Sequence, residues 1–104
     1  MADVNPYNLY KNQSILLAPP EELTLMLYNG CIKFIRQAQA FIDSNNISGA
    51  NTCIIRAQDI ILELLATLDM SYPVSGSLSQ LYNYINRRLI DANIEKNTGI
   101  LEEV

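Results

Sequence analysis

PEELTLMLYNGCIKFIRQAQAFID, residues 20–43, has the spacing of a helix that is apolar over more than half of its circumference. Pro20 suits a first helical turn, and Glu21 and Glu22 place negative charge at the positive end of the helix dipole. The apolar positions recur every three or four residues along two lines, which are Leu23, Leu27, Gly30, Cys31, Phe34, Ala38, Phe41 and, beside them, Leu25, Tyr28, Ile32, Ile35, Ile42. A helix on a protein surface needs an apolar stripe of only about 100°. We therefore predict a helix over 20–43 that buries two faces.

The rest of the chain predicts more helices of the same kind. Helical periodicity covers residues 48–68 and 75–94, and a fourth periodic segment begins at 98–104. Turn-forming residues separate these segments, and the alternation typical of strands is absent from the sequence. Short connections favour antiparallel neighbours. The expected fold is all-α, an antiparallel up-down bundle of the four-helix type over residues 19–104, with its fourth helix reduced to a stub.

Such a bundle should leave part of its apolar surface open. Three helices with wide apolar faces and only a short fourth helix should expose a groove, and large apolar patches usually mark a partner surface. The groove would receive a helix or an extended apolar segment. Residues 1–18 form an arm that contains Tyr7 and Tyr10 and should pack on the bundle or in the partner groove. As an ordered tail it would cover part of the bundle, and as a lid it would compete with the partner.

Composition excludes several classes of function. The chain has 104 residues, which is one domain, and it contains no histidine, so neither a Ser-His-Asp triad nor an imidazole metal site is expected. A net charge of −4 argues against nucleic acid and against an anionic membrane surface. The start of the chain does not read as a signal peptide, and the apolar runs are too short to span a membrane. We expect a cytoplasmic protein without cofactor or metal.

Two residue pairs could carry chemistry. Asp59 and Glu63 lie one helical turn apart and could act as an acid and a base, but their polar face beside Arg56 favours a solvated surface with helix ion pairs. Cys31 and Cys53 should lie about 12 Å apart along antiparallel helices, which is too far for a disulfide. We interpret them as small core residues.

A third cluster combines aromatic and basic side chains. Tyr82, Tyr84, Arg87 and Arg88 could stack on and attract a single-stranded nucleic acid. Two arginines on an acidic protein attract such a ligand weakly. The favoured interpretation is that Tyr82 packs inward and that both arginines pair with carboxylates.

Four segments together resemble the flagellin-specific export chaperone family, FliS. They are Asn-Pro-Tyr-x-x-Tyr at 5–10, ELTLMLYNG at 22–30, Ala-Gln-Asp-Ile-Ile-x-Glu-Leu at 57–64, and Leu-Tyr-x-Tyr-Ile-x-Arg-Arg-Leu-Ile-x-Ala-Asn at 81–93. The segments occur in the family's order and spacing, so the resemblance covers nearly the whole chain. Members usually continue through a full fourth helix.

The resemblance implies a cytoplasmic chaperone without catalysis. It would bind the disordered C-terminal segment of flagellin, prevent early polymerisation and support delivery to the flagellar type III export apparatus, and Tyr7 and Tyr10 would act as the lid. The candidate flagellin-binding residues are the exposed apolar positions beside the core stripes together with those two tyrosines: Tyr7, Tyr10, Tyr28, Ile32, Ile35, Ile55 and Leu62. One alternative is a self-associating structural or regulatory protein without a flagellin client, in which a second copy fills the seam left by the short fourth helix. Another is an enzyme that uses Asp59 and Glu63.

Overall fold

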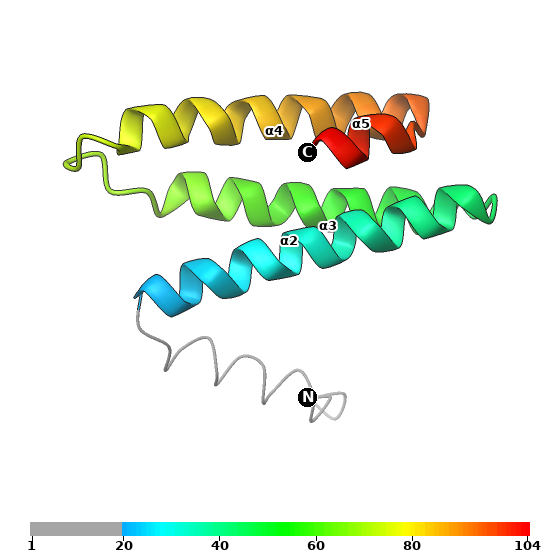
Figure 1. Cartoon of the computed structure of the whole chain (residues 1–104), viewed down its shortest axis with the longest axis horizontal. Coiled ribbons are helices and arrows are strands. Elements are labelled where there is room, and N and C mark those ends of the chain that lie inside the picture. The colour runs from blue at the N-terminus through cyan, green and yellow to red at the C-terminus, as the bar shows by residue number, and fades with distance from the viewer. Residues whose placement is uncertain (1–19) are drawn as a thin grey trace, which may run out of the picture.

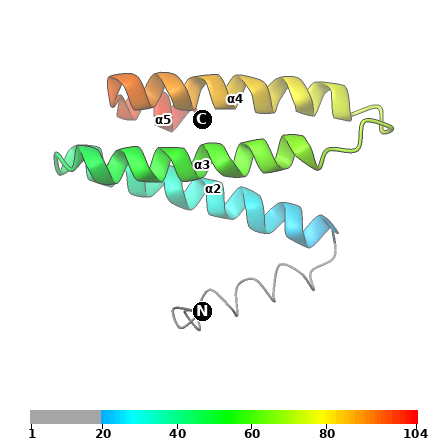
Figure 2. The same cartoon turned by 180° about the vertical axis from the view of Figure 1, so that it is seen from behind.

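The computed structural model describes residues 20–104, and the expected arm with Tyr7 and Tyr10 lies outside the described residues. Three long helices, α2 (Pro20–Asp43), α3 (Ile47–Ala66) and α4 (Ser75–Glu95), run antiparallel in sequence order, with α3 between α2 and α4 (Figure 1). A six-residue helix, α5 (Thr98–Glu103), follows α4 and returns along it, as the view from behind also shows (Figure 2). All regular structure from residue 20 onward is helical, which confirms the all-α bundle.

Two asparagines form the tight turn between α2 and α3. Asn45 adopts a left-handed conformation with φ of 60°, and Asn46 caps α3 by accepting a hydrogen bond of 2.9 Å from the Gly49 amide. Gly49 lies against Phe41, and an added Cβ would be 3.0 Å from the ring carbon Cγ. The turn expected from the Ser- and Asn-rich sequence is therefore also a point of close packing between α2 and α3.

The core lies along the line where the long helices meet. Its members are small or branched apolar side chains, with one tyrosine: Cys31, Ile35, Ala38, Cys53, Ile54, Ala57, Ile61, Leu64, Tyr82, Leu89, Ala92, Ile100 and Leu101. Four alanines and cysteines of this set come from α2 and α3, where short side chains let the helices approach. Leu89 and Ile54 are fully buried, as the predicted core stripes require.

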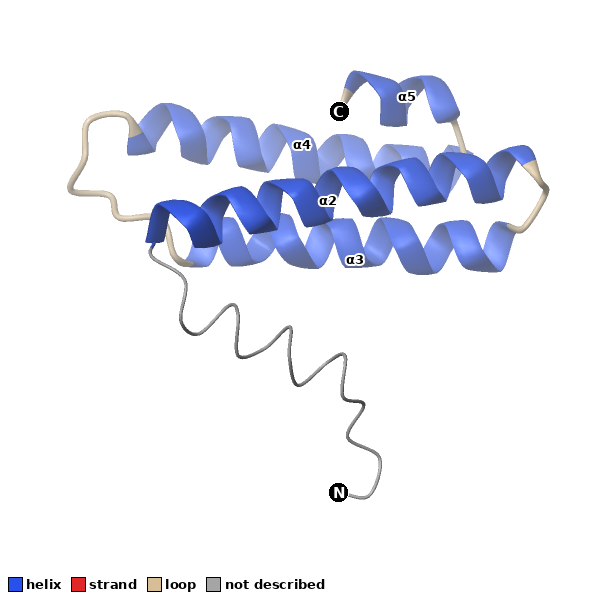
Figure 3. Ribbon diagram, turned by 60° about the horizontal axis from the view of Figure 1, so that its bottom comes forward, coloured by secondary structure: helices blue, strands red, loops and turns tan. Residues whose placement is uncertain are grey.

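The short α5 covers only part of the side formed by α2 and α4. Figure 3 shows α5 beside one half of these helices, near the α2–α3 turn, whereas the half near the α3–α4 connection has no described helix over it. Asn97 caps α5 through its side chain, which accepts bonds from the amides of Gly99 at 2.8 Å and Ile100 at 3.3 Å. Leu101 then anchors α5 in the core with 1% of its surface exposed.

Two details differ from the sequence-based expectation. The second helix begins at Ile47 and ends at Ala66, two residues before the expected end. The connection to α4 begins earlier because Asp69 forms a local turn, in which its Oδ1 accepts a bond of 2.9 Å from the Ser71 amide. Leu81, expected on the buried face of the third helix, is half-exposed.

Candidate functional site

An apolar groove lies between α2 and α4, beside the end of α5. We call it the α2–α4 groove. It is lined mainly by Tyr28, Ile32 and Ile35 from α2 and by Leu81, Tyr82 and Ile85 from α4, with Cys31, Ile61 and Val104 completing it. Its volume is about 290 Å³, and it is open to solvent. A groove of this size and composition accepts a few apolar side chains of another segment.

Tyr28 and Tyr82 bridge the two walls of the groove. Their hydroxyl groups form a hydrogen bond with each other, and their ring centroids lie 6.4 Å apart at an interplanar angle of 59°. Burial, helped by the bond to Tyr28, raises the pKa of Tyr82 to about 12. Tyr82 therefore remains neutral at physiological pH, and the hydrogen-bonded pair places one polar point in an otherwise apolar groove.

A second hollow lies on the other side of the tyrosine pair. It has a volume of about 320 Å³, is bounded by Leu68, Tyr72 and Leu78, and shares Tyr28 and Tyr82 with the first. The bridge therefore separates two hollows that follow each other along the same side of the bundle. A ligand longer than one hollow would cross over the tyrosines.

Polar contacts hold α5 at the other end of the groove. Arg88 on α4 forms ion pairs with Asp91 at 3.0 Å and with Glu103 on α5 at 3.2 Å. Tyr84 donates a hydrogen bond to Glu103, and this bond together with Arg88 lowers the pKa of Glu103 below its usual value. On the α2 side, Gln39 donates a bond of 3.0 Å to Glu102. These contacts attach α5 to both walls, so α5 closes this end of the groove.

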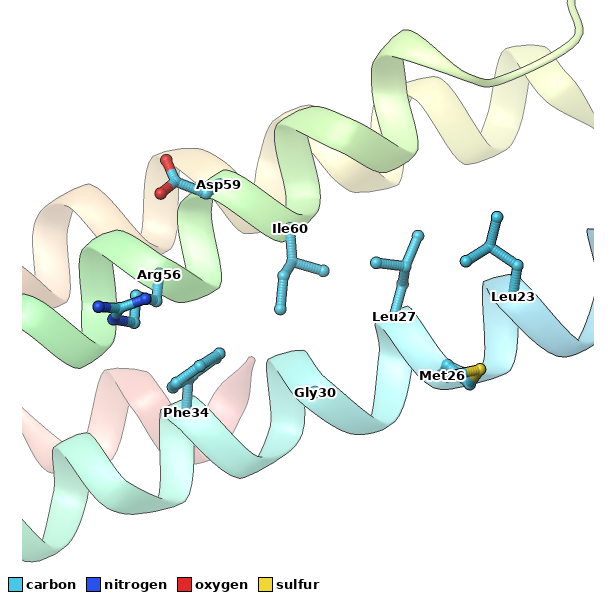
Figure 4. A pocket seen from close by; sticks show the side chains of 8 residues that line it. All are labelled: Leu23, Met26, Leu27, Gly30, Phe34, Arg56, Asp59 and Ile60. Carbon is cyan, nitrogen blue, oxygen red and sulfur yellow. The ribbon is translucent and has the colours of Figure 1, made fainter. Parts of the chain in front are cut away.

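A separate hollow lies between α2 and α3 (Figure 4). Leu23, Met26, Leu27, Phe34 and Ile60 line it, Gly30 lies at its floor, and its volume is about 300 Å³. Arg56 lies at its edge, with the guanidinium carbon 6.0 Å from the centre of the Phe34 ring. The sequence placed Leu23, Leu27, Gly30 and Phe34 on a core stripe, and all four are half-buried, with Leu27 and Phe34 packed against the core while they also line this hollow. Cys31 and Ala38 of the same stripe are buried at the centre of the core, together with Ile35 from the second line.

The predicted binding residues in the described part of the chain lie on two different surfaces, the α2–α4 groove and the exposed side of α3. Tyr28 is 37% exposed and Ile32 48% exposed at the groove, whereas Ile35 is only 7% exposed and lies in its floor. Ile55 and Leu62 are half-exposed on α3 but line none of the hollows described above. The three α2 residues predicted to bind the partner therefore do lie at one groove. The two α3 residues predicted with them, Ile55 and Leu62, do not line that groove.

Leu81 is the exposed groove residue that sequence reasoning missed. It is 50% exposed and forms part of the α4 wall. The signal was present, because Leu81 is adjacent to the buried Tyr82 and so points about 100° away from it around the helix. Both were assigned to one apolar face, although only one of them can lie at its centre.

The remaining candidates match their interpretation as core or surface residues, but the helix ion pairs expected of Asp59 and Glu63 are not formed within residues 20–104. Cys31 and Cys53 are both free and buried, and burial raises the pKa of the Cys31 thiol to about 11. Asp59 and Glu63 are exposed, and among residues 20–104 the acidic and thiol side chains form no cluster suited to a metal. No helix in the described part of the chain is long and apolar enough to cross a membrane.

The aromatic and basic cluster on α4 has a structural role, with a buried tyrosine and a paired arginine, and does not form a surface for nucleic acid. Tyr82 is buried and Arg88 pairs with carboxylates, as expected. Arg87 is exposed and forms no ion pair with any residue of the described segment, so the expectation that both arginines pair is wrong for Arg87. A single free arginine beside these tyrosines does not make a basic surface for nucleic acid.

The fold and its hollows are those of a helical binding protein, because a bundle with open apolar grooves offers its surface to segments of another chain. A family model described as "Flagellar protein FliS" matches residues 3–104. The flagellar secretion chaperone FliS of Bacillus subtilis is 48% identical over 104 residues, which are 100% of this chain and 78% of that protein. The chain belongs to the FliS family.

Relatives with lower sequence identity agree. The flagellar secretion chaperone FliS of Salmonella typhimurium is 30% identical over 94 residues, covering 88% of this chain and 70% of that protein. The protein of the same name from Campylobacter jejuni is 32% identical over 100 residues, covering 94% of this chain and 78% of that protein. The resemblance stated from the four sequence segments is thereby confirmed.

Proposed function

We propose that this protein is a cytoplasmic export chaperone that binds the disordered C-terminal segment of flagellin. In this role it prevents premature polymerisation and supports delivery of flagellin to the flagellar type III export apparatus. Membership of the FliS family supports the chaperone role, and the relatives reported above carry the name flagellar secretion chaperone. The observation that carries the client site is the open, apolar α2–α4 groove.

The physical basis is folding coupled to binding. A disordered segment loses backbone freedom when it docks, at a cost of about 2–5 kcal/mol, so apolar burial must exceed that cost. A hollow of about 290 Å³ buries only a few side chains. The client must therefore gain its affinity over a long path, and the hollow beyond Tyr28 and Tyr82 extends that path along the same side.

Each candidate residue has a specific role in this proposal. Tyr28, Ile32 and Leu81 contact the client at the walls, and Ile35 supplies the floor. Ile55 and Leu62 offer a separate contact on α3 for a client that wraps around the bundle. Tyr7 and Tyr10 act as the lid, which rests on the family resemblance. The protein binds its client without catalysing a reaction, so Asp59 and Glu63 are solvent-exposed surface residues with no catalytic role.

Calorimetric titration of a flagellin C-terminal peptide into the full chain tests the proposal. We expect saturable 1:1 binding with a negative heat-capacity change, because apolar surface is buried. Ile32→Asp and Leu81→Asp should each weaken binding at least tenfold. Ile94→Asp is the matched control, since Ile94 is 78% exposed on α4 and lines none of the described hollows.

Two outcomes would contradict the proposal. The first is the absence of binding, and the second is an equal loss in all three variants, which would place the client elsewhere. A concentration-dependent mass that the peptide does not alter would favour the alternative, a self-associating protein without a flagellin client. Retained peptide binding in the Asp59→Ala, Glu63→Ala double variant is expected, and its loss would give those carboxylates a role.

A further inference from the structure

One face of α2 carries a stripe of exposed residues at helical spacing. Glu21, Leu25, Tyr28, Ile32 and Arg36 follow one another at intervals of three or four residues, and at 100° per residue they fall within an arc of about 80°. We call these five residues the α2 stripe. All five are exposed, and Leu25 exposes 57% of its surface. Glu21 and Arg36 form no ion pair with any residue from 20 to 104.

The stripe has opposite charges at its ends and apolar side chains between them. Glu21 and Arg36 lie equally far from the midpoint between Tyr28 and Asn29, and so do Leu25 and Ile32. We propose that the α2 stripe binds the α2 stripe of a second copy of this chain, antiparallel and about a two-fold axis at that midpoint. Glu21 then meets Arg36 of the second copy, and Leu25 meets Ile32 of the second copy.

The charge pattern is the reason for assigning this surface to a second copy in this orientation. A two-fold axis brings both opposite-charge pairs together at once, since an isologous interface repeats every contact. A parallel pairing would place Glu21 on Glu21 and Arg36 on Arg36, which is repulsive. From Glu21 to Ile32 the spacing of four, three and four residues is that of the contact line between two helices in a coiled coil, and Arg36 lies at its edge.

The size of the stripe indicates a weak dimer. Its sixteen residues extend about 24 Å along the helix, and a contact between two such helices is smaller than the roughly 1,200–2,000 Å² of stable interfaces. The charged ends are exposed, so the association should weaken as salt rises. The dimer is thus a form that a tighter ligand can displace.

Dimer and client share part of one surface. Tyr28 and Ile32 belong both to the stripe and to the α2–α4 groove. A bound client in the groove therefore excludes the second copy, and this part of the inference rests on the proposed function. The proposal of the dimer rests only on the residues of the α2 stripe and does not require a client.

Sedimentation of the full chain over a range of concentrations at low salt tests the pairing. We expect the mass to rise from monomer to dimer. Glu21→Arg and Arg36→Glu should each raise the dimer dissociation constant at least tenfold, and the double variant that combines them should restore it. Glu63→Arg is the control, because it makes the same change of charge on an exposed α3 residue and should leave the dimer unchanged.

The double variant separates pairing from loss of structure, because a helix damaged by Glu21→Arg would not recover when Arg36→Glu is added. A chain that stays monomeric at every concentration would overturn the inference, and so would a dimer that the single variants leave intact or the double variant fails to restore. Binding of the flagellin peptide by a strictly monomeric chain would overturn the dimer and leave the proposed chaperone function standing.

Discussion

The hydroxyl groups of Tyr28 and Tyr82 are hydrogen-bonded across the open side of the bundle, joining α2 to α4. The two residues are 54 positions apart in the sequence, and α3, which lies between them in the chain, contributes Ile61 and Leu64 to the hollows on the two sides of the pair. Tyr82 is buried, whereas Tyr28 is partly exposed. The bond therefore forms at the boundary between core and groove, and it contributes both to stability and to the shape of the groove.

A double-mutant cycle on this pair should show strong coupling. Tyr28→Phe and Tyr82→Phe each remove the bond, and each should lower the free energy of unfolding by about 1 kcal/mol. The double variant should cost little more than either single variant, because the bond can be lost only once. Urea unfolding measures all three values, and additive losses would show that the two hydroxyl groups act independently.

The glycines of α2 and α3 should respond to alanine in opposite ways. A Cβ at Gly30 would make an ordinary contact of 3.4 Å with Ile60, so Gly30→Ala should stabilise the protein by about 0.5–1 kcal/mol through helix propensity. A Cβ at Gly49 would lie 3.0 Å from Phe41 and 3.0 Å from the capping side chain of Asn46. Gly49→Ala should therefore destabilise it by about 1–2 kcal/mol. Thermal melts that shift in the same direction for both variants would contradict the packing argument.

Acid should weaken the attachment of α5. Hydrogen bonds from Tyr84 and Arg88 lower the pKa of Glu103 from its usual 4.5, so its contribution to stability is complete above that pH. The contribution is lost as the pH falls through the lowered folded pKa. Glu103→Gln should therefore show a smaller decrease in stability over this range than the natural protein, as melts at stepwise lower pH would detect. Parallel curves for the two proteins would rule out this carboxylate as a source of acid sensitivity.

Leu101 should be the main apolar anchor of α5. Its side chain is fully buried, and Leu101→Ala should cost about 2–5 kcal/mol through lost burial and the cavity left behind. Glu102→Ala on the same helix is the matched control and should stay within about 0.5 kcal/mol, since its residue is exposed. Chemical unfolding of both variants would decide the matter, and a similar cost for the two would mean that α5 is held by its polar contacts.

Much of the fold could be predicted because local sequence sets it. Asn46 and Asn97 supply the side-chain caps of α3 and α5. The buried positions Ile54 and Leu64 lie where the helical periodicity puts them. The predicted end of α3 was two residues too late. The turn at Asp69 depends on a side-chain hydrogen bond, which the spacing of apolar residues does not reveal.

The candidate site was only partly predictable because it depends on helix rotation. Tyr28 and Ile32 were identified as exposed apolar positions, but whether Ile35 faced core or solvent required knowing where α5 packs. The contact between Tyr28 and Tyr82 joins separate helices, and no local pattern encodes it. Likewise, Leu81 and Tyr82 are adjacent and both apolar, so periodicity alone did not show which of them points outward.

The length of α5 has a consequence for the groove that it closes. Isolated helices shorter than about 12–15 residues are unstable in water, and α5 has six. Its structure therefore depends on packing at Ile100 and Leu101 and on the contacts of Glu103, and it can unfold locally at lower free energy than the three long helices. Amide hydrogens of α5 should consequently exchange with deuterium earlier than those of α3. Each such opening would lengthen the groove by the space that α5 vacates. The length of the groove therefore depends on whether α5 is folded.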